Sequence, residues 1–212
     1  MPLYKTIKPN NHSTIYVWKI EASFDDLLKD ISLTENSKKR LLSMKSEIHQ
    51  RGFLSVRQLL KEAGYSDHDL YYLKDGKPHL TDQKHISITH SFNFSAVAIS
   101  DGEIGIDIEK NREKIKIIQH KFVNFERGFI NKEDDLIAQL TVIWGAKESL
   151  YKIYPHGGLT FKNDIDINSF KISDKRTTGY IKVKNWDKQY DIRFEQIEDF
   201  SLVYALDPIK ND

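Results

Sequence analysis

The stretch IGIDIEK, residues 104–110, combines alternating isoleucines with two carboxylates. Side chains alternate between the two faces of a β-strand, so the three isoleucines are expected to point into a core. Asp107 and Glu109 then share the opposite face of the strand. Two like charges on one face repel each other and call for compensation, either by a divalent cation or by a pair of lysines. This stretch alone leaves both alternatives open.

Composition limits the class of protein. The chain has 212 residues, enough for one large domain or two small ones. Hydrophobic residues make up 39% and charged residues 30%, as in ordinary soluble globular proteins. Lys and Arg number 32 against 31 Asp and Glu, a net charge of +1 that argues against nucleic-acid binding through bulk charge.

The absence of cysteine excludes disulfides, thiolate metal sites and cysteine nucleophiles, and it suits a reducing cytoplasm. The N-terminal residues contain no long apolar run, so no signal peptide is expected. No segment approaches the roughly 18 apolar residues of a membrane span. We therefore expect a cytoplasmic protein.

The first half of the sequence predicts strands and helices around short turns. Apolar residues recur at three- and four-residue spacing between residues 24 and 64, which predicts helices that stop at Gly64. Asp101-Gly102 is a strong hairpin signal that would join two paired strands. The predicted strands and turn are 13–20, 85–91, 94–100, the returning strand 103–109 and the turn DGKP at 75–78.

The second half repeats this order of elements. Asn131 can cap a helix that runs to about Tyr154, with Glu133 and Asp134 in its first turn. One face of this helix carries Leu136, Leu140, Ile143, Lys147 and Leu150. Strands follow at 167–173, 178–186, 189–197 and 200–206. The strand FSLVYAL resembles FSAVAIS of the first half, which indicates two similar halves.

The helical stretch WGAKESLYK, residues 144–152, carries a second group of functional side chains. Glu148 and Lys152 are four residues apart on one face, and Trp144 lies one turn before Glu148. Taken alone, this pattern describes a surface Glu–Lys pair beside a core tryptophan. The acidic pair of the strand, taken alone, also describes an ordinary solvated face.

Together the two stretches predict a different site. Glu148 can join Asp107 and Glu109 to give an oxygen-rich cluster of the kind that suits Mg²⁺, whose coordination substrate phosphates often complete. Lys147 and Lys152 would neutralise phosphate charge, and His90 would add a hydrogen-bond donor from a neighbouring strand. The residues therefore predict a Mg²⁺ and phosphate site, without indicating which phosphate compound binds.

The combination of IGIDIE with WGAKESLYK resembles the two-part signature of the 4′-phosphopantetheinyl transferases, in particular the longer surfactin-synthetase-activator type. Three further stretches match in family order: SITHS (87–91), DGKPHL (75–80) and the arginine of HQRGFLSVRQLL. The resemblance implies an α+β fold of two similar α/β halves related by a pseudo-twofold axis, with the active site between them. We expect the halves to be residues 1–102 and 103–212, tightly packed as a pseudo-dimer in one chain.

The resemblance assigns roles in the second half of the chain. Asp107, Glu109 and Glu148 match the Mg²⁺ ligands, and Lys152 matches a lysine near the diphosphate of coenzyme A. Lys147 matches a phosphate contact. Glu126 falls where the family has a glutamate proposed as general base, although a metal-bound water can replace it. The residues expected to carry catalysis are therefore Glu126, Glu148 and Lys152.

In the first half, the resemblance assigns coenzyme A contacts. His90 matches a histidine that contacts the phosphates, and Thr89 stands where the family usually has serine. Arg51 matches an arginine that binds the 3′-phosphate, with help expected from Lys39. Lys77 and Pro78 match a Gly-Lys-Pro stretch beside the adenine. The stretch YPHGGLTF after Lys152 departs from the family pattern, so the loop that faces the carrier protein is expected to differ.

The activity that the resemblance implies is Mg²⁺-dependent transfer of 4′-phosphopantetheine from coenzyme A to a serine of an apo acyl- or peptidyl-carrier protein. Adenosine 3′,5′-bisphosphate is the second product, and the enzyme is expected to be a monomer. Two alternatives remain: a module that binds coenzyme A or a carrier protein without catalysis, and a Mg²⁺-dependent hydrolase of small diphosphates. Neither a nucleic acid nor a membrane is expected as a partner.

Overall fold

The computed structural model describes residues 3–130 and 135–208. The chain divides into two compact units, unit 1 (Met1–Gly102) and unit 2 (Glu103–Asp212). Each unit combines helices with an antiparallel sheet, in agreement with the predicted α+β class. The pseudo-twofold relation of the halves and the active site between them stay predictions. In the described part of the chain, no helix is long and apolar enough to cross a membrane.

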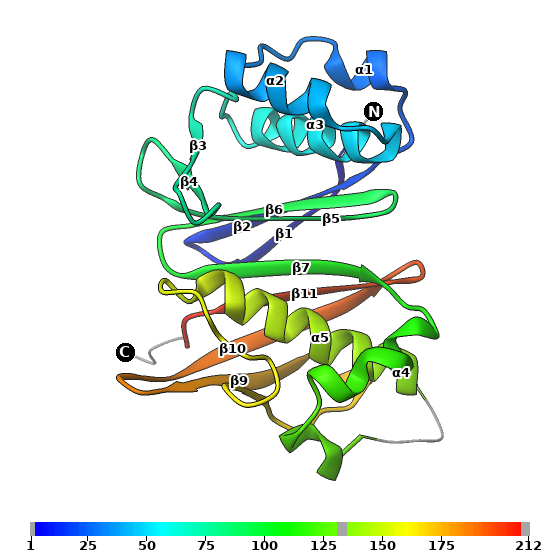
Figure 1. The fold of residues 1–212 in the computed structure, drawn as a ribbon, viewed down its shortest axis with the longest axis vertical. Helices are drawn as coiled ribbons and strands as arrows, with labels where there is room; N and C mark the ends of the chain where they lie inside the picture. Colours follow the sequence, from blue (N-terminus) through cyan, green and yellow to red (C-terminus); the bar gives the residue numbers. More distant parts are fainter. Residues whose placement is uncertain (1–2, 131–134, 209–212) are drawn as a thin grey trace. The chain divides into compact units, whose positions relative to one another are not determined.

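Unit 1 is built on a four-stranded sheet in the order β1-β2-β6-β5, with all neighbouring strands antiparallel. Its three helices lie over one face of this sheet (Figure 1), and β3 and β4 form a separate two-stranded sheet. The elements are β1 (Leu3–Asn10), β2 (Ser13–Lys19), α1 (Phe24–Leu28), α2 (Glu35–Ser43), α3 (Glu47–Glu62), β3 (Leu70–Tyr72), β4 (Pro78–Leu80), β5 (His85–Ser91) and β6 (Phe94–Ser100).

The predicted helical region of unit 1 contains three helices because hydroxyl side chains cap two internal starting points. Ser23 accepts a hydrogen bond from the Asp26 amide at the start of α1. Thr34 accepts one from the Ser37 amide at the start of α2. These caps satisfy amide groups that have no partner within the helix, so each short helix begins at a defined residue.

Unit 2 contains a five-stranded antiparallel sheet in the order β7-β11-β10-β9-β8, and α5 packs across β7 and β11 (Figure 1). Short helical turns connect β7 to α5. The elements are β7 (Ile104–Lys110), α4 (Lys114–Ile118), η1 (Gln119–Lys121), η2 (Phe125–Gly128), α5 (Leu136–Ile153), β8 (Ile165–Ile167), η3 (Ile172–Asp174), β9 (Arg176–Val183), β10 (Trp186–Ile197) and β11 (Phe200–Leu206).

The predicted hairpin at Asp101-Gly102 is wrong. Strand β6 pairs with β2 and β5, whereas β7 pairs with β11 along its whole length. The Asp101 amide donates to the His12 carbonyl, and its carboxylate contacts the His12 ring and the Lys84 ammonium, all within unit 1. The Asp-Gly pair therefore ends unit 1, because seven residue pairs with β11 outweigh a local turn preference.

Two other boundaries differ from the predictions. The predicted strand 167–173 is limited to β8, and residues 172–174 form the short helix η3 instead. Helix α5 begins at Leu136, with Asp135 as its N-cap in a left-handed conformation. The predicted cap Asn131 and the first-turn acids Glu133 and Asp134 lie outside the described residues.

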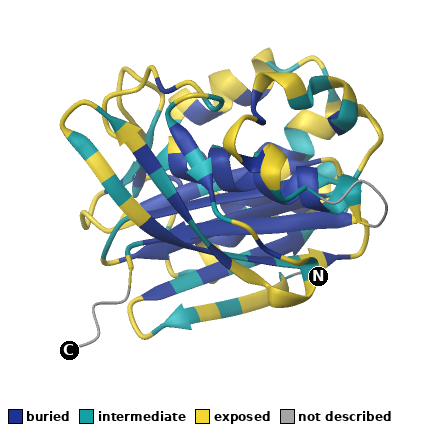
Figure 2. Ribbon diagram, turned by 90° about the horizontal axis from the view of Figure 1, so that it is seen from below, coloured by how far each residue is buried: buried dark blue, intermediate teal, exposed yellow. Residues whose placement is uncertain are grey.

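Each unit has an apolar core between its sheet and its helices, and buried residues follow the strands and the inner sides of the helices (Figure 2). In unit 2, Val203 of β11 belongs to the core that faces α5, and it pairs in register with Asp107 of β7. Side chains of paired residues share one face of a sheet, so Asp107 also faces α5. The three isoleucines of β7 are buried on the other face, as predicted from the alternation.

Candidate active site

The two acidic stretches predicted from the sequence meet where α5 crosses β7. Asp107 and Glu109 lie on β7, and Glu148 lies on α5. Burial and, after it, the negative charges of Asp107 and Glu109 together raise the pKa of the Glu148 carboxyl to about 7, against the opposing effect of Lys152. The three carboxylates, here called the acidic cluster, therefore lie near one another where the helix packs on the strand.

Lys152 provides a cation beside the acidic cluster. Its ammonium donates to the Asp107 carboxylate at 3.0 Å and to the Ile106 carbonyl at 2.7 Å. The side chain of Lys152 remains 27% exposed, whereas that of Asp107 is 7% exposed. The lysine therefore balances part of the acidic charge from the solvent side of the cluster.

The acidic cluster has the donor chemistry that a hard divalent cation prefers, because all three side chains offer carboxylate oxygens. Among residues 3–130 and 135–208, however, no three His, Asp or Glu side chains stand close enough together to hold a metal ion. The contact between Lys152 and Asp107 gives a physical reason, since the ammonium already lies beside one carboxylate oxygen. The donor set thus fits Mg²⁺ in kind, while its side chains are not gathered around a common centre.

Two glycines allow α5 to approach β7 and β11 closely. A Cβ atom on Gly105 would overlap the carbonyl oxygen of Ser149 on α5. A Cβ atom on Gly145 would lie 2.8 Å from a methyl carbon of Val203. Close approach of backbones is a common reason for glycine in a strand. It places the Glu148 face of the helix directly over the carboxylates of β7.

Lys147 and Glu126 are placed differently from the predicted roles. Both side chains are fully buried, and the Lys147 ammonium lies 2.7 Å from the Glu126 carboxylate. Burial lowers the pKa of Lys147, and the negative charge of Glu126 opposes this shift. Neither group can touch a bound substrate in this structure. The predicted phosphate contact of Lys147 and the predicted general base Glu126 are therefore replaced by a buried ion pair, here called the closed pair.

Trp144 is also a packing residue. Its ring centroid lies 5.3 Å from that of Phe122 and 5.2 Å from that of Phe161. The tryptophan thus packs against the segment before α5 and the loop after it. This placement agrees with the interpretation of Trp144, from the sequence alone, as a core tryptophan.

Unit 1 contains a hollow of about 330 Å³ between α2, α3, β3 and β5. It is lined by Arg40, Met44, His49, Gly52, Phe53, Val56, Arg57, Tyr72, Ile88 and His90. Arg40, His49 and His90 among apolar and aromatic side chains form a surface suited to an anionic ligand with a flat group. We call it the cationic hollow.

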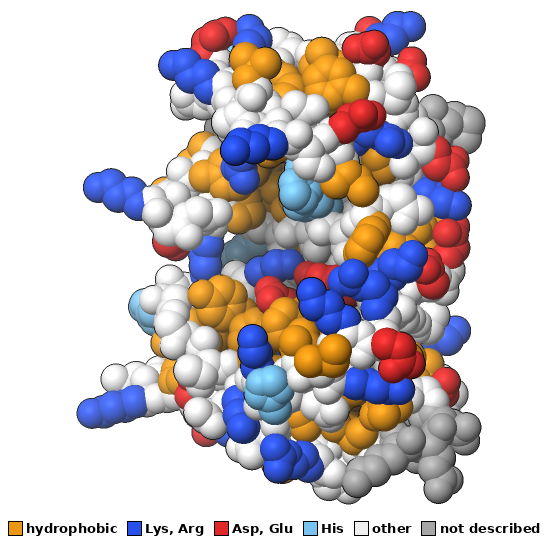
Figure 3. Space-filling view, turned by 45° about the vertical axis from the view of Figure 1, so that its right-hand side comes forward, with side chains coloured by type: hydrophobic (Ala, Val, Ile, Leu, Met, Phe, Trp, Pro, Cys, Tyr) orange, Lys and Arg blue, Asp and Glu red, His pale blue; other side chains and the backbone are white. Residues whose placement is uncertain are grey.

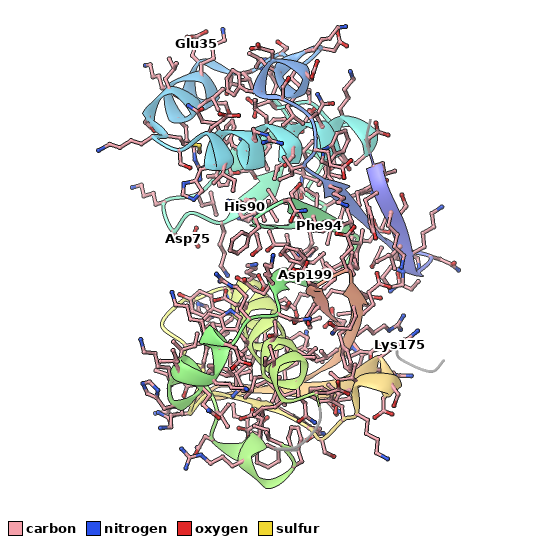
Figure 4. All side chains as sticks on the ribbon, turned by 90° about the vertical axis from the view of Figure 1, so that its right-hand side faces the viewer. Glu35, Asp75, His90, Phe94, Lys175 and Asp199 are labelled. Carbon is pink, nitrogen blue, oxygen red and sulfur yellow. The ribbon has the colours of Figure 1, made fainter. Side chains whose placement is uncertain are left out.

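His90 lies at the floor of the cationic hollow, beneath α3 (Figure 4). Its ring packs so closely on Gly52 that a Cβ atom there would lie 2.9 Å from the imidazole Cδ2. The sequence placed His90 on a strand neighbouring the acidic strand, which is wrong: β5 pairs with β6 in the sheet of unit 1. Its predicted phosphate contact stays a prediction.

The other residues predicted for unit 1 lie around the cationic hollow. Arg51 donates from its guanidinium to the Ile20 carbonyl at 3.0 Å and is not among the lining residues. Lys39 is exposed on α2. Pro78 pairs in register with Tyr72, which lines the hollow, and Lys77 precedes it in the turn; Thr89 is buried on β5.

Sequence reasoning missed Arg40 and His49. The guanidinium of Arg40 lies 5.1 Å from the ring centre of Tyr72 and 5.8 Å from that of Phe53, so it faces the hollow, unlike its neighbour Lys39. His49 lines the hollow one turn before Phe53. The spacing of His49 and Phe53 on one helix face was the available signal. For Arg40, the run KKR gives no means of choosing among three cations.

Acidic and basic side chains are interspersed on the face drawn in Figure 3, in keeping with the balanced composition. The charged groups that matter are local, in the acidic cluster of unit 2 and the cationic hollow of unit 1.

Comparison with known proteins relates the chain to one class of enzymes. Residues 103–205 match the family model of the 4′-phosphopantetheinyl transferase superfamily. The chain is also 29% identical, over 140 residues, to the 4′-phosphopantetheinyl transferase gsp of Aneurinibacillus migulanus. That match covers 63% of this chain and 57% of the relative. Both comparisons confirm the resemblance drawn from the motifs and relate the chain to transferase enzymes.

Proposed function

We propose that this protein transfers the 4′-phosphopantetheine group of coenzyme A to a serine of an apo acyl- or peptidyl-carrier protein. The observation that carries the proposal is that Asp107 and Glu109 of β7 and Glu148 of α5 lie where the helix packs on the strand, beside Lys152. Three carboxylates in one place favour a divalent cation, and a neighbouring ammonium favours a phosphate group. The similarity to phosphopantetheinyl transferases supports the same reaction.

The acidic cluster would hold Mg²⁺, which would supply positive charge against a diphosphate and its leaving oxygen. Lys152, a partly exposed cation that contacts the Asp107 carboxylate, would bind a diphosphate oxygen directly. In the cationic hollow, Arg40, His49 and His90 would bind the phosphate of the nucleotide end. Tyr72 and Phe53 offer flat apolar faces for its base.

In the proposed step, the serine hydroxyl oxygen attacks the β-phosphate that carries the pantetheine arm. The bond between this phosphorus and the bridging oxygen breaks, and adenosine 3′,5′-bisphosphate leaves. Because Glu126 is buried, we propose that a water molecule accepts the serine proton. Catalysis consists of positioning and charge neutralisation, so no covalent enzyme intermediate is expected. We also propose that the protein works in the cytoplasm and as a monomer.

The test is intact-protein mass spectrometry of an apo carrier protein incubated with this protein, coenzyme A and Mg²⁺. A gain of one phosphopantetheine group that EDTA prevents is the expected result. Glu113→Gln, on the exposed start of α4, is the matched control for acidic substitutions in the cluster. Absence of any gain across acyl- and peptidyl-carrier proteins would overturn the proposal.

Two other readouts separate the alternatives. Calorimetric binding of coenzyme A without any modified carrier protein would indicate a binding module. Release of adenosine 3′,5′-bisphosphate without a carrier protein would indicate a diphosphate hydrolase. Chromatography of the nucleotide products distinguishes these outcomes in the same incubation.

A further inference from the structure

The closed pair is more extensively bonded than charge balance alone requires. Four oxygen atoms lie within 2.8 Å of the Lys147 ammonium: one carboxylate oxygen of Glu126 and three main-chain carbonyls. The carbonyls belong to Phe122, Phe161 and Ile165. A buried ammonium is tolerated only where such partners replace water. Lys147 therefore connects α5 to the segment before it, to the loop after it and to β8.

Glu126 extends the same connection. Its two carboxylate oxygens accept hydrogen bonds from the Asn124 amide at 3.1 Å and from the Ile167 amide at 3.0 Å. The amide of Ile167 belongs to β8 and that of Asn124 to the segment before η2. The closed pair thus joins four pieces of unit 2 through one ion pair.

The position of Lys147 on α5 makes this connection relevant to the acidic cluster. Glu148 is the next residue, about 100° further around the helix, so any rotation that moves one side chain moves the other. Where α5 packs on β7, Gly105 lies so close to the Ser149 carbonyl that a Cβ atom would overlap it. The helix is therefore fixed at β7 by a glycine contact and at β8 by an ion pair.

We propose that Lys147 and Glu126 are positioning residues that fix the rotation of α5 and so direct Glu148 and Lys152 toward Asp107. This inference rests on the proposed function for its catalytic consequence. Its structural consequence can be measured separately, because the geometry of three carboxylates controls the affinity of the free protein for a divalent cation. Manganese(II) chloride alone is the probe.

The first variant is the double substitution Lys147→Met with Glu126→Gln. It removes both buried charges together, so neither charge is left unpaired. The carbonyls of Phe122, Phe161 and Ile165 lose their donor, so we expect the melting temperature to fall by several degrees while the protein stays folded at the assay temperature. We also expect Mn²⁺ affinity, measured by electron paramagnetic resonance, to fall about 10-fold or more, as for other groups that orient metal ligands.

In the transferase assay, the same double variant should lose about 10- to 100-fold in kcat. The KM for coenzyme A should stay within about threefold of the wild-type value, because the closed pair is not expected to affect the ground-state binding of coenzyme A. The matched control is Lys116→Met with Glu113→Gln, which removes an exposed ion pair of the same unit on α4. This control should change neither Mn²⁺ affinity nor kcat.

Glu126→Asp guards against a double variant that fails to fold. It keeps the charge but shortens the side chain by one methylene, so α5 should shift without loss of the core. Mn²⁺ affinity is expected to fall several-fold with the melting temperature lowered by a few degrees. Wild-type Mn²⁺ affinity and kcat in a folded double variant, or in Glu126→Asp if the double variant does not fold, would overturn the inference. A wild-type protein that transfers nothing overturns only the proposed function, since the Mn²⁺ comparison remains.

Discussion

Two ion pairs on helix α5, five residues apart, use the same chemistry for opposite purposes. The closed pair of Lys147 and Glu126 is fully buried, and its ammonium is surrounded by protein oxygens. The pair of Lys152 and Asp107 is partly exposed and lies beside two further carboxylates. A cation with no remaining capacity for partners can hold a fold together. A cation that still faces solvent can exchange its protein partner for a ligand.

The same contrast recurs in unit 1. Arg57 is buried, pairs with Asp67 at 2.9 Å, and stacks with its guanidinium 3.5 Å from the ring centre of Phe53. Arg40 lies over the same ring but is exposed, and it forms no ion pair with any residue that the structure describes. Arg57 is therefore assigned to the fold and Arg40 to a ligand. The difference lies in the number of partners, which the residue type does not reveal.

The carboxylates show the contrast through their pKa values. Burial alone would raise the pKa of Asp67, but hydrogen bonds from Thr34 and Ser37 and the charge of Arg57 bring it below the usual value. Burial and the neighbouring acids together raise the pKa of Glu148 to about 7. Protein partners thus satisfy the first carboxylate, while the second gains from a bound cation.

The largest expected effect comes from Glu148→Gln, which removes one carboxylate of the acidic cluster. We expect transfer to fall by at least about 10³-fold, since the group acts on charge in the transition state. The melting temperature should stay the same or rise, because a desolvated charge has been removed. Initial rates of carrier-protein modification and thermal unfolding give both quantities. Near-normal turnover would remove Glu148 from the site and end the contrast between the two ion pairs of α5.

Gly105→Ala tests whether the acidic cluster, unlike the closed pair, depends on the close spacing of α5 and β7. The added Cβ would overlap the Ser149 carbonyl oxygen, so the helix must move. We expect a loss of about 1–3 kcal/mol in the free energy of unfolding and a fall in transfer beyond what that loss explains. Gly128→Ala is the control, because a Cβ there meets nothing within 4 Å. Urea titration and rate measurements on folded protein would reveal a variant with unchanged activity, which would contradict the expectation.

The sequence predicted several strands well, and the contrast with the closed pair shows why. Strands β5, β6 and β11 have the predicted limits, because short alternating runs between turns carry their own signal. Glu148 and Lys152 are four residues apart, and this spacing predicts a shared helix face from the sequence alone. The contact between Lys147 and Glu126 joins residues 21 positions apart through irregular structure. No periodicity reports such a contact, and burial alone decides whether a lysine serves a fold or a substrate.

Arg40→Gln sharpens the comparison in unit 1, with Lys39→Gln as its neighbour on the same helix. Loss of a charge-assisted contact to phosphate should raise the KM for coenzyme A about 10-fold with little change in kcat. Lys39→Gln should leave KM within about twofold, because Arg40 lines the hollow and Lys39 does not. Steady-state kinetics at saturating carrier protein separate the two variants. The reverse order of effects would return a phosphate contact to Lys39, which the family resemblance gave as an assistant to Arg51.

The smallest effect expected is a pH dependence of stability that belongs to Glu148. Its pKa is about 7 in the folded protein against a usual value of 4.5, so between these values the folded state holds a proton that the unfolded state has lost. The free energy of unfolding should therefore fall as pH rises from about 4.5 to 7, by at most about 3 kcal/mol. Asp67 has the opposite sign: its contribution is present above its usual pKa and is lost as pH falls through its lowered value in the folded protein. Urea unfolding in EDTA at several pH values should show the fall in the wild type and a flatter profile in Glu148→Gln. Added Mg²⁺ should reduce the fall in the wild-type protein, because a bound cation favours the ionised carboxylate. Identical pH profiles for the wild type and Glu148→Gln would contradict the expectation and would mean that protein partners already satisfy Glu148, as they do the closed pair.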